Sequence, residues 1–292
     1  MFRSSARVFV PMLRIASVLV AVLVVAGPGP GASARPATSA RPATRAVSLT
    51  SLNWIFYRED LDRIDAADPS IVRTLASGPG TYELEHRPGG RTLPDGINPV
   101  ELFSSIATFR AAESDAKVIP GVRTVAYDLE FFHLTPVAER QNPLVYLRAF
   151  ALAARASGYQ PILIPGRDLV RQPGAACGQP PGVTISQAYL NCGLPGTATN
   201  ALIYVIQSAP VETNLPALRQ LVQQSAAQAR HANPNVIVVA TLAAAPNGVP
   251  VTSSALTAAA RAILPYVQGF ELNSKPPTDR RVVSFLENLA RG

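Results

Sequence analysis

Most of this 292-residue chain repeats one pattern, in which a short apolar stretch is followed by a longer stretch with helical spacing. Apolar runs of four to eight residues without alternation are typical of strands buried on both faces, and such strands belong to parallel sheets covered by helices. Five units follow one another from Arg123. The predicted strands are 123–129, 160–164, 201–207, 236–242 and 267–272, and the predicted helices are 142–157, 185–192, 215–231, 253–264 and 279–289. The repeat places the chain in the α/β class.

Three strands before Arg123 would complete a ring of eight. The candidate strands are 47–57, 70–76 and 81–86, and the candidate helices between Arg58 and Arg123 are 58–66 and 98–112, the latter beginning at Asn98 and Pro99. The sequence thus predicts a TIM-type (β/α)8 barrel, with an N-terminal part that could be irregular or incomplete. An open doubly wound sheet is the alternative, and it is less favoured because no Gly-rich phosphate loop follows the first strand.

The N-terminal segment predicts export. Arginines precede an apolar run of twelve residues, 15–26, and Ala32-Ser33-Ala34 follows as a small-residue cleavage site. We expect residues 1–34 to be a signal peptide cleaved after Ala34; an uncleaved anchor is the alternative, although the run is shorter than the ~20 residues that span a bilayer. No later segment is long and apolar enough to span. The protein is therefore predicted to be secreted, either extracellular or associated with the cell wall.

The next stretch, 35–46, repeats Arg-Pro-Ala-Thr without apolar periodicity and is predicted to be a disordered linker. Residues 47–292 are expected to form one barrel domain, because barrels of this kind commonly use about this length undivided. A composition with 48% hydrophobic and 15% charged residues supplies a large core.

The net charge of +7 does not indicate a nucleic-acid partner. Residues 1–45 hold six arginines and no acidic residue, which accounts for all but one of the net positive charges. The remaining chain is nearly neutral and lacks the basic surface that a polyanion requires.

The two cysteines, Cys177 and Cys192, lie in one Pro/Gly-rich stretch. In an oxidising compartment they are expected to form a disulfide worth ~3 kcal/mol. A zinc site is less favoured, because the chain has no Cys-x-x-Cys and no histidine near these residues.

Two carboxylates mark the end of the predicted strand 123–129. Asp128 and Glu130 are separated by one residue, so in a strand both side chains point to the same face while Tyr127 and Leu129 point to the other. Two like charges at this spacing raise each other's proton affinity, which would keep one of them protonated near neutral pH. The pair therefore predicts a site for acid catalysis.

Other polar residues follow the ends of the later strands. Sites in parallel barrels lie where strands end, and the polar residues at these ends that we expect to bind substrate are Arg167, Gln207, Glu271 and Asn273. Carboxylates and amides that meet at one mouth suit sugar recognition and glycosidic-bond cleavage. A structural ion network is the alternative interpretation of the Asp128–Glu130 pair.

The Tyr-Asp-Leu-Glu ending at Glu130 resembles the Asp-x-Glu that closes a barrel strand in glycoside hydrolases of the chitinase type (family 18) and the lysozyme type (family 25). The resemblance implies that Glu130 is the acid and that Asp128 orients the substrate or stabilises an intermediate. The domain also resembles uncharacterised secreted actinobacterial barrel proteins, through this motif and the later Thr135-Pro136, Glu139 and Asn142-Pro143. That likeness covers most of residues 47–290 and implies no activity.

The predicted function is cleavage of a polysaccharide or glycan by carboxylate acid/base catalysis without a cofactor. A non-catalytic carbohydrate-binding barrel is the first alternative, favoured because Arg123, Thr124, Val125 and Ala126 stand where the chitinase pattern has further aspartates and glycines. A metal-dependent hydrolase that uses Asp128, Glu130 and His133 is the second.

Overall fold

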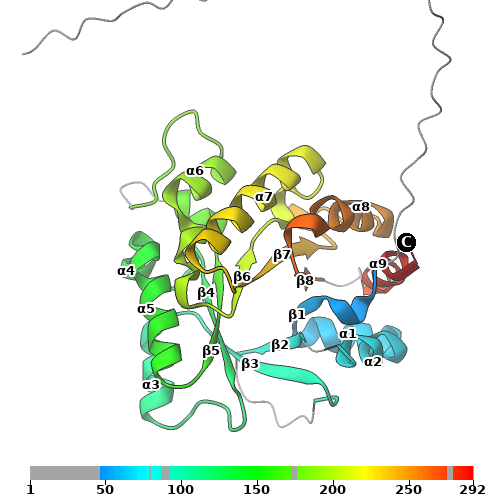
Figure 1. Cartoon of the computed structure of the whole chain (residues 1–292), viewed down its shortest axis with the longest axis horizontal. Helices are drawn as coiled ribbons and strands as arrows, with labels where there is room; N and C mark the ends of the chain where they lie inside the picture. The colour runs from blue at the N-terminus through cyan, green and yellow to red at the C-terminus, as the bar shows by residue number, and fades with distance from the viewer. Residues whose placement is uncertain (1–46, 79, 87–92, 172–175, 275–278, 292) are drawn as a thin grey trace, which may run out of the picture. The chain divides into compact units, whose positions relative to one another are not determined.

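Eight parallel strands form a closed barrel in the computed structural model, which describes residues 47–78, 80–86, 93–171, 176–274 and 279–291 (Figure 1). The strands are β1 (Asn53–Tyr57), β2 (Thr81–Glu85), β3 (Ile97–Phe103), β4 (Thr124–Leu129), β5 (Gln160–Pro165), β6 (Ile203–Ile206), β7 (Ile237–Ala243) and β8 (Gly269–Asn273). Each strand pairs with its neighbour in the sequence, and β1 pairs with β8, with Ile55 opposite Glu271. The predicted (β/α)8 barrel is confirmed, and the open sheet is wrong.

Helices connect most consecutive strands and surround the barrel (Figure 1). They are α1 (Arg58–Ala67), α2 (Pro69–Ala76), α3 (Ile106–Ser114), α4 (Val137–Gln141), α5 (Pro143–Ala156), α6 (Ile185–Cys192), α7 (Leu215–Ala232), α8 (Ser253–Ile263) and α9 (Asp279–Arg291). Two helices follow β1, whereas the described residues between β2 and β3 form none. The barrel is therefore irregular in its N-terminal part.

The predicted strand at 70–76 is wrong, because this segment is the helix α2. Pro69 occupies the first turn, and the Asp68 side chain accepts a hydrogen bond of 2.9 Å from the Ser70 amide, which caps the helix. Ile71, Val72 and Leu75 are buried at helical spacing. The β-branched pair favours a strand locally, and the packing of one helix face outweighs that preference.

The predicted helix at 98–112 is also wrong in its first half. Asn98 and Pro99 lie in β3, and the helix α3 begins only at Ile106, where the Ser105 hydroxyl caps it by accepting from the Thr108 amide at 3.0 Å. Pro99 lies opposite Glu83 of β2, and pairing of β3 with β4 starts only at Val100, so Pro99 has a strand partner on one side. The strand β4 is the fourth strand, as predicted, with β3 in place of 70–76.

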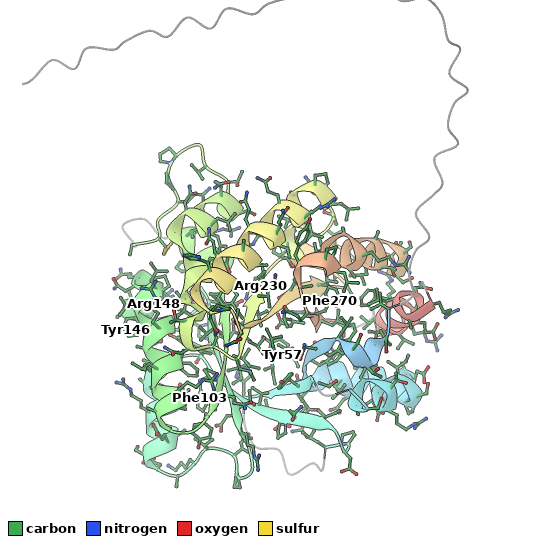
Figure 2. All side chains as sticks on the ribbon, viewed as in Figure 1. Tyr57, Phe103, Tyr146, Arg148, Arg230 and Phe270 are labelled. Carbon is green, nitrogen blue, oxygen red and sulfur yellow. A yellow bond between two sulfur atoms is a disulfide. The ribbon has the colours of Figure 1, made fainter. Side chains whose placement is uncertain are left out.

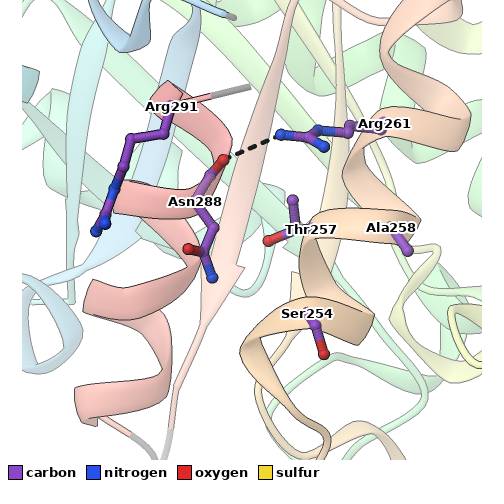
Figure 3. A pocket seen from close by; sticks show the side chains of 6 residues that line it. All are labelled: Ser254, Thr257, Ala258, Arg261, Asn288 and Arg291. Carbon is purple, nitrogen blue, oxygen red and sulfur yellow. Dashed lines mark hydrogen bonds between the residues drawn. The ribbon is translucent and has the colours of Figure 1, made fainter. Parts of the chain in front are cut away.

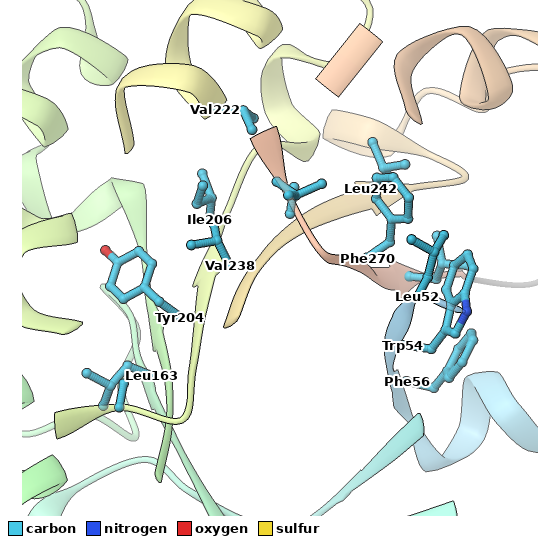
Figure 4. Packing of buried hydrophobic residues seen from close by; sticks show 14 of the residues in the cluster. Leu52, Trp54, Phe56, Leu163, Tyr204, Ile206, Val222, Val238, Leu242 and Phe270 are labelled. Atoms are coloured by element: carbon cyan, nitrogen blue, oxygen red, sulfur yellow. The ribbon is translucent and has the colours of Figure 1, made fainter. Parts of the chain in front are cut away.

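The core has two layers that follow from strand alternation. Side chains pointing outward, such as Phe103 and Phe270, pack beneath the helices (Figure 2). Figure 4 shows part of this outer layer, in which the Trp54 ring lies 6.1 Å from that of Phe56 and 5.7 Å from that of Phe270, centre to centre. Apolar residues pointing inward fill the barrel; among them are Ile55, Val100, Ala126, Ile162, Val205 and Val239. Inward positions beyond this plug, at the C-terminal ends of the strands, are left for polar residues.

The disulfide between Cys177 and Cys192 is confirmed, with Cα atoms 5.2 Å apart. It joins the loop after β5 to the last residue of α6. The signal peptide predicted for 1–34 and the linker predicted for 35–46 lie outside the described residues. In the described part of the chain, none of the helices combines the length and apolar character needed to cross a bilayer.

Candidate active site

Four strands bring polar side chains to the C-terminal mouth of the barrel. Asp128 lies on the inner face of β4, two residues beyond the plug residue Ala126, and Glu130 directly follows this strand. Gln207 follows β6 at the same inward phase as Val205. Thr241 of β7 and Glu271 of β8 are partners in strand register. The structure thus brings together Asp128, Glu130, Gln207 and Glu271.

Glu130 is half-buried and is held by an amide. The Gln207 side-chain nitrogen donates to Glu130 Oε1 across the mouth. Burial raises the pKa of Glu130, the bond from Gln207 opposes the rise, and the nearby charge of Asp168 adds to it. Glu130 is therefore a carboxyl with increased proton affinity that stays accessible from the mouth.

The backbone beside Glu130 is tightly packed against the end of β5. Gly166 faces it, and a β-carbon on Gly166 would lie 3.1 Å from Glu130 Cα and 2.5 Å from Asp168 Oδ1. A side chain here would require the Glu130 backbone and the Asp168 carboxylate to shift, so glycine allows the two chain segments to approach each other as closely as they do. Asp168 Oδ1 accepts a hydrogen bond of 3.1 Å from the Phe131 amide, which ties the residue after Glu130 to the end of β5.

Asp128 is buried deeper, with 8% of its surface exposed. Its Oδ1 atom has no hydrogen-bond partner among the residues that the structure describes. Burial raises the pKa of Asp128 well above its ordinary value, and the charges of Glu130, Glu271 and Asp168 raise it further. Burial and the three neighbouring carboxyls therefore favour the protonated form of Asp128.

Glu271 is the third carboxyl in the mouth and is 3% exposed. The Thr241 hydroxyl donates to Glu271 Oε2, and the Thr241 carbonyl accepts from the Ser208 hydroxyl at 2.6 Å, which fixes the position of this donor. Burial raises the pKa of Glu271 to about 7, the Thr241 bond opposes the rise, and the charges of Glu130 and Asp60 add to it. A group with this pKa can take up and release protons near neutral pH.

Three residues of the mouth, Tyr57, Asp60 and Asp168, were missed as site residues. Tyr57 ends β1, and burial raises its pKa well above the ordinary value, with further increases from Asp128, Glu271, Glu130 and Asp60 (Figure 2). Its hydroxyl therefore lies among the carboxyls as a neutral donor. Applying the strand-end rule to the first predicted strand, 47–57, would have found it.

Asp60 and Asp168 add charge to the mouth, and both also accept hydrogen bonds that link neighbouring segments of the chain. Asp60 Oδ1 accepts bonds from the Ser274 amide at 3.2 Å and its hydroxyl at 2.8 Å, and it contacts the Arg63 guanidinium. These bonds join the start of α1 to the end of β8. Asp168 was missed in favour of its neighbour Arg167, although Asp168 continues the inward phase of Ile162 and Ile164 into the 3-10 turn (Arg167–Arg171) that follows β5, so strand alternation would have found it.

Arg167 and Asn273 make their described contacts outside the carboxyl cluster, although the charge of Asp168 acts on Arg167. Arg167 is 7% exposed, and its guanidinium donates to the Ser186 hydroxyl of α6 at 2.8 Å and lies near Tyr189. Asn273 is half-buried and lines a hollow of about 260 Å³ with Pro210 and Asn247. The structure thus places Asn273 at the rim of the mouth and Arg167 beneath α6.

His133 is exposed and packs edge-on against Phe132, with ring centres 6.1 Å apart. Across the described ranges, no group of three or more His, Cys, Asp or Glu side chains has an arrangement that could hold a metal ion. The structure does not bring His133 together with Asp128 and Glu130.

The rest of the motif around Asp128 has a structural role. The Tyr127 hydroxyl, on the outer face of β4, donates to Glu139 Oε2, and the same oxygen accepts from the Ile106 amide at 3.3 Å. Glu139 therefore joins α4 and the start of α3 to the back of β4. These contacts confirm that Tyr127 belongs to the core rather than to the site, and they brace the loop that follows Glu130.

A separate groove lies between two of the outer helices. Ser254, Thr257 and Arg261 of α8 face Asn288 and Arg291 of α9 across it, and Arg261 donates to the Asn288 carbonyl at 3.0 Å (Figure 3). This bond ties the two helices together. None of the residues that line the groove is a carboxylate, so the groove is distinct from the mouth.

The fold and the mouth define a (β/α)8 barrel with a buried cluster of carboxyls where its strands end. No family profile and no curated protein matches the chain. Solved structures similar to it include a curdlan-specific GH128 (subgroup III) exo-β-1,3-glucanase from Blastomyces gilchristii, with 13% identity, a TM-score of 0.44 and coverage of 77% of this chain and 90% of that one.

A putative α-L-fucosidase from Bacteroides thetaiotaomicron is also similar, with 10% identity, a TM-score of 0.49 and coverage of 90% and 98%. A third is the carboxyl transferase domain of Rhizobium etli pyruvate carboxylase, with 10% identity, a TM-score of 0.44 and coverage of 83% and 48%. The three proteins differ in activity, and the likenesses assign none to this chain.

Proposed function

We propose that the protein hydrolyses glycosidic bonds in a polysaccharide or glycan, with carboxyl groups as acid and base. The observation that carries the proposal is the convergence of Glu130 and Glu271, both with raised pKa, at the mouth of one barrel. Glycosidic cleavage needs one carboxyl that donates a proton to the leaving oxygen and a second that activates water or stabilises the anomeric carbon.

Glu130 is the proton donor in this proposal. Glu130 is half-buried and is therefore more accessible to the leaving oxygen of a bound sugar than Asp128 and Glu271, which are buried. The bond from Gln207 to Glu130 Oε1 leaves the other oxygen free to carry the proton.

Glu271 is the base that activates water. The strands β4 and β8 are four apart in a ring of eight, so Glu130 and Glu271 extend from opposite walls. In this proposal a water molecule binds between Glu271 and the anomeric carbon. The water proton passes to Glu271, the water oxygen bonds to the anomeric carbon, the glycosidic bond breaks, and the leaving oxygen takes the proton of Glu130. The configuration at the anomeric carbon is inverted.

The test is a screen of the purified protein against cell-wall and capsule polysaccharides, with release of reducing ends as the readout. Glu130→Gln and Glu271→Gln should each lower the rate by ~10²-fold or more, because each removes a proton-transfer group. Asp115→Asn is the matched control, since Asp115 is an exposed acid paired with Lys117 away from the mouth. Glycan binding without hydrolysis in any form would favour the non-catalytic alternative instead.

We also propose that the domain acts outside the cytoplasm. The Cys177–Cys192 disulfide supports this, because such bonds persist in oxidising compartments. Sequencing the N-terminus of the exported protein tests the predicted cleavage; a mature chain that begins at Arg35 is expected, and a chain that retains residues 1–34 would overturn it.

A further inference from the structure

The mouth holds more carboxyls than glycosidic hydrolysis uses. Besides Glu130 and Glu271, it contains Asp128, Asp168 and Asp60, whose charges act on one another or on Glu271 and Tyr57. Of these three, Asp60 and Asp168 accept hydrogen bonds from described backbone amides. Asp128 Oδ1 has no partner among the described residues, although more than nine-tenths of the residue's surface is buried.

Two neighbouring donors of the site already have other partners, and the Tyr57 hydroxyl does not donate to Asp128 Oδ1. The amide of Gln207 donates to Glu130, and the hydroxyl of Thr241 donates to Glu271. A buried carboxyl oxygen without a hydrogen-bond partner destabilises the folded protein, and a ligand that supplies the missing donor removes this cost on binding.

The charge around Asp128 indicates what kind of donor fits. The charged groups that act on its pKa are the carboxyls of Glu130, Glu271 and Asp168. Within the described part of the chain, the guanidinium groups nearest to this cluster have other partners, since Arg63 contacts Asp60 and Arg167 donates to Ser186. A hydroxyl would satisfy only the hydrogen bond, whereas an ammonium group supplies up to three N–H donors and offsets the negative charge.

We propose that the sugar bound in the mouth carries a free amine and that Asp128 binds its ammonium group. This inference rests on the function proposed above, and it makes the substrate a glycan that contains unacetylated amino sugars. The carboxyls that face this position come from every side: Asp128 and Glu130 from β4, Asp168 from the end of β5 and Glu271 from β8, while Tyr57 of β1 and Gln207 after β6 are neutral.

Ammonium binding should release protons. In the free protein, burial and mutual repulsion raise the pKa of Asp128 and of Glu271, the latter to about 7, which favours the protonated forms of both. A bound cation favours the ionised carboxylate, which lowers the proton affinity of the cluster. Affinity for an amine-bearing ligand should therefore rise between pH 5 and pH 7, where an acetylated ligand should show no such rise.

The experiment is calorimetric titration of the protein with chitosan oligosaccharides and with fully N-acetylated oligomers of the same length. Two buffers of different ionisation enthalpy report the protons released. We expect the free-amine oligomer to bind roughly tenfold more tightly or better, with proton release, because a charge-assisted bond to a buried carboxylate supplies at least that difference. Asp128→Asn should abolish the preference, so that the two oligomers bind with similar affinity, whereas Asp115→Asn should leave the preference as it is in the unmodified protein.

Equal affinity for the two oligomers, or a preference that survives Asp128→Asn, would overturn the inference. Reducing ends measured in the same samples separate it from the proposed function. Cleavage of acetylated or neutral glycans at the same rate as free-amine glycans leaves hydrolysis standing and refutes amine recognition. Preferential binding of the free-amine oligomer without cleavage refutes hydrolysis and leaves amine recognition standing.

Discussion

Replacing Gly166 by alanine is expected to slow hydrolysis by about tenfold without unfolding the protein. The added β-carbon would lie 3.1 Å from Glu130 Cα, whereas ordinary contacts begin near 3.4 Å, so the backbone of Glu130 must shift by a few tenths of an ångström. A displacement of about 1 Å at a catalytic group costs roughly 10²-fold, and a fraction of that displacement therefore costs about tenfold.

The same β-carbon would lie 2.5 Å from Asp168 Oδ1 and would push this carboxylate away from the Phe131 amide. Loss of that bond should lower the free energy of unfolding by about 1–2 kcal/mol. Initial rates of reducing-end release measure the first effect, and urea unfolding measures the second.

Gly196→Ala is the matched control, because a β-carbon there meets no atom within 4 Å. It should leave both rate and stability unchanged. Asp168→Ala removes the side chain that the new methyl group would strike, so the Gly166→Ala and Asp168→Ala effects should be less than additive in the double variant. A Gly166→Ala protein with the wild-type rate would show that Glu130 does not need its observed position.

Three other perturbations test separate parts of the structure. Burial raises the pKa of Glu212 to about 8, so the folded state binds this proton more strongly than the unfolded state, and the free energy of unfolding should fall as pH rises from about 4.5 to 8. Glu212→Gln should flatten that fall by at most about 5 kcal/mol. Urea unfolding at several pH values measures this, and an unchanged pH dependence in the variant would refute it. Replacing Cys177 and Cys192 by serine should lower the free energy of unfolding by ~3 kcal/mol and leave activity intact below the melting temperature; an unaltered urea midpoint would contradict this. NMR of fresh product should show the inverted anomer, whereas retention would rule out Glu271 as a base acting on water.

The strands from β4 onward could be predicted because each apolar run is followed by a helix whose start or end is marked in the sequence. The first third of the chain offered conflicting signals for helix and strand. Asn98–Pro99 and Asn142–Pro143 are the same helix-start pair, yet only the second precedes a helix. The first pair belongs to a strand because β3 pairs with β2 on one side and β4 on the other. These partners lie outside the short stretch of sequence from which a helix start is predicted. Tertiary pairing thus decided what local propensity could not.

The site residues likewise include some that the local sequence pattern predicts and some properties that it does not. Asp128, Gln207 and Glu271 follow the inward phase of their strands, which period-2 alternation predicts. Asp168 continues the inward phase of Ile162 and Ile164 in the same way, whereas Arg167, which was predicted in its place, has the outward phase. The raised pKa values depend on burial and on carboxyls from different strands, neither of which a single stretch of sequence contains.

The most direct test of Glu130 as the proton donor compares two leaving groups in one variant. Natural sugar leaving groups need a proton, whereas an acidic nitrophenol does not. Glu130→Gln should therefore lose ~10²-fold or more on an oligosaccharide and retain most of its activity on the matching nitrophenyl glycoside. An equal loss on both substrates, or no loss on either, would contradict the assignment of Glu130 as the acid.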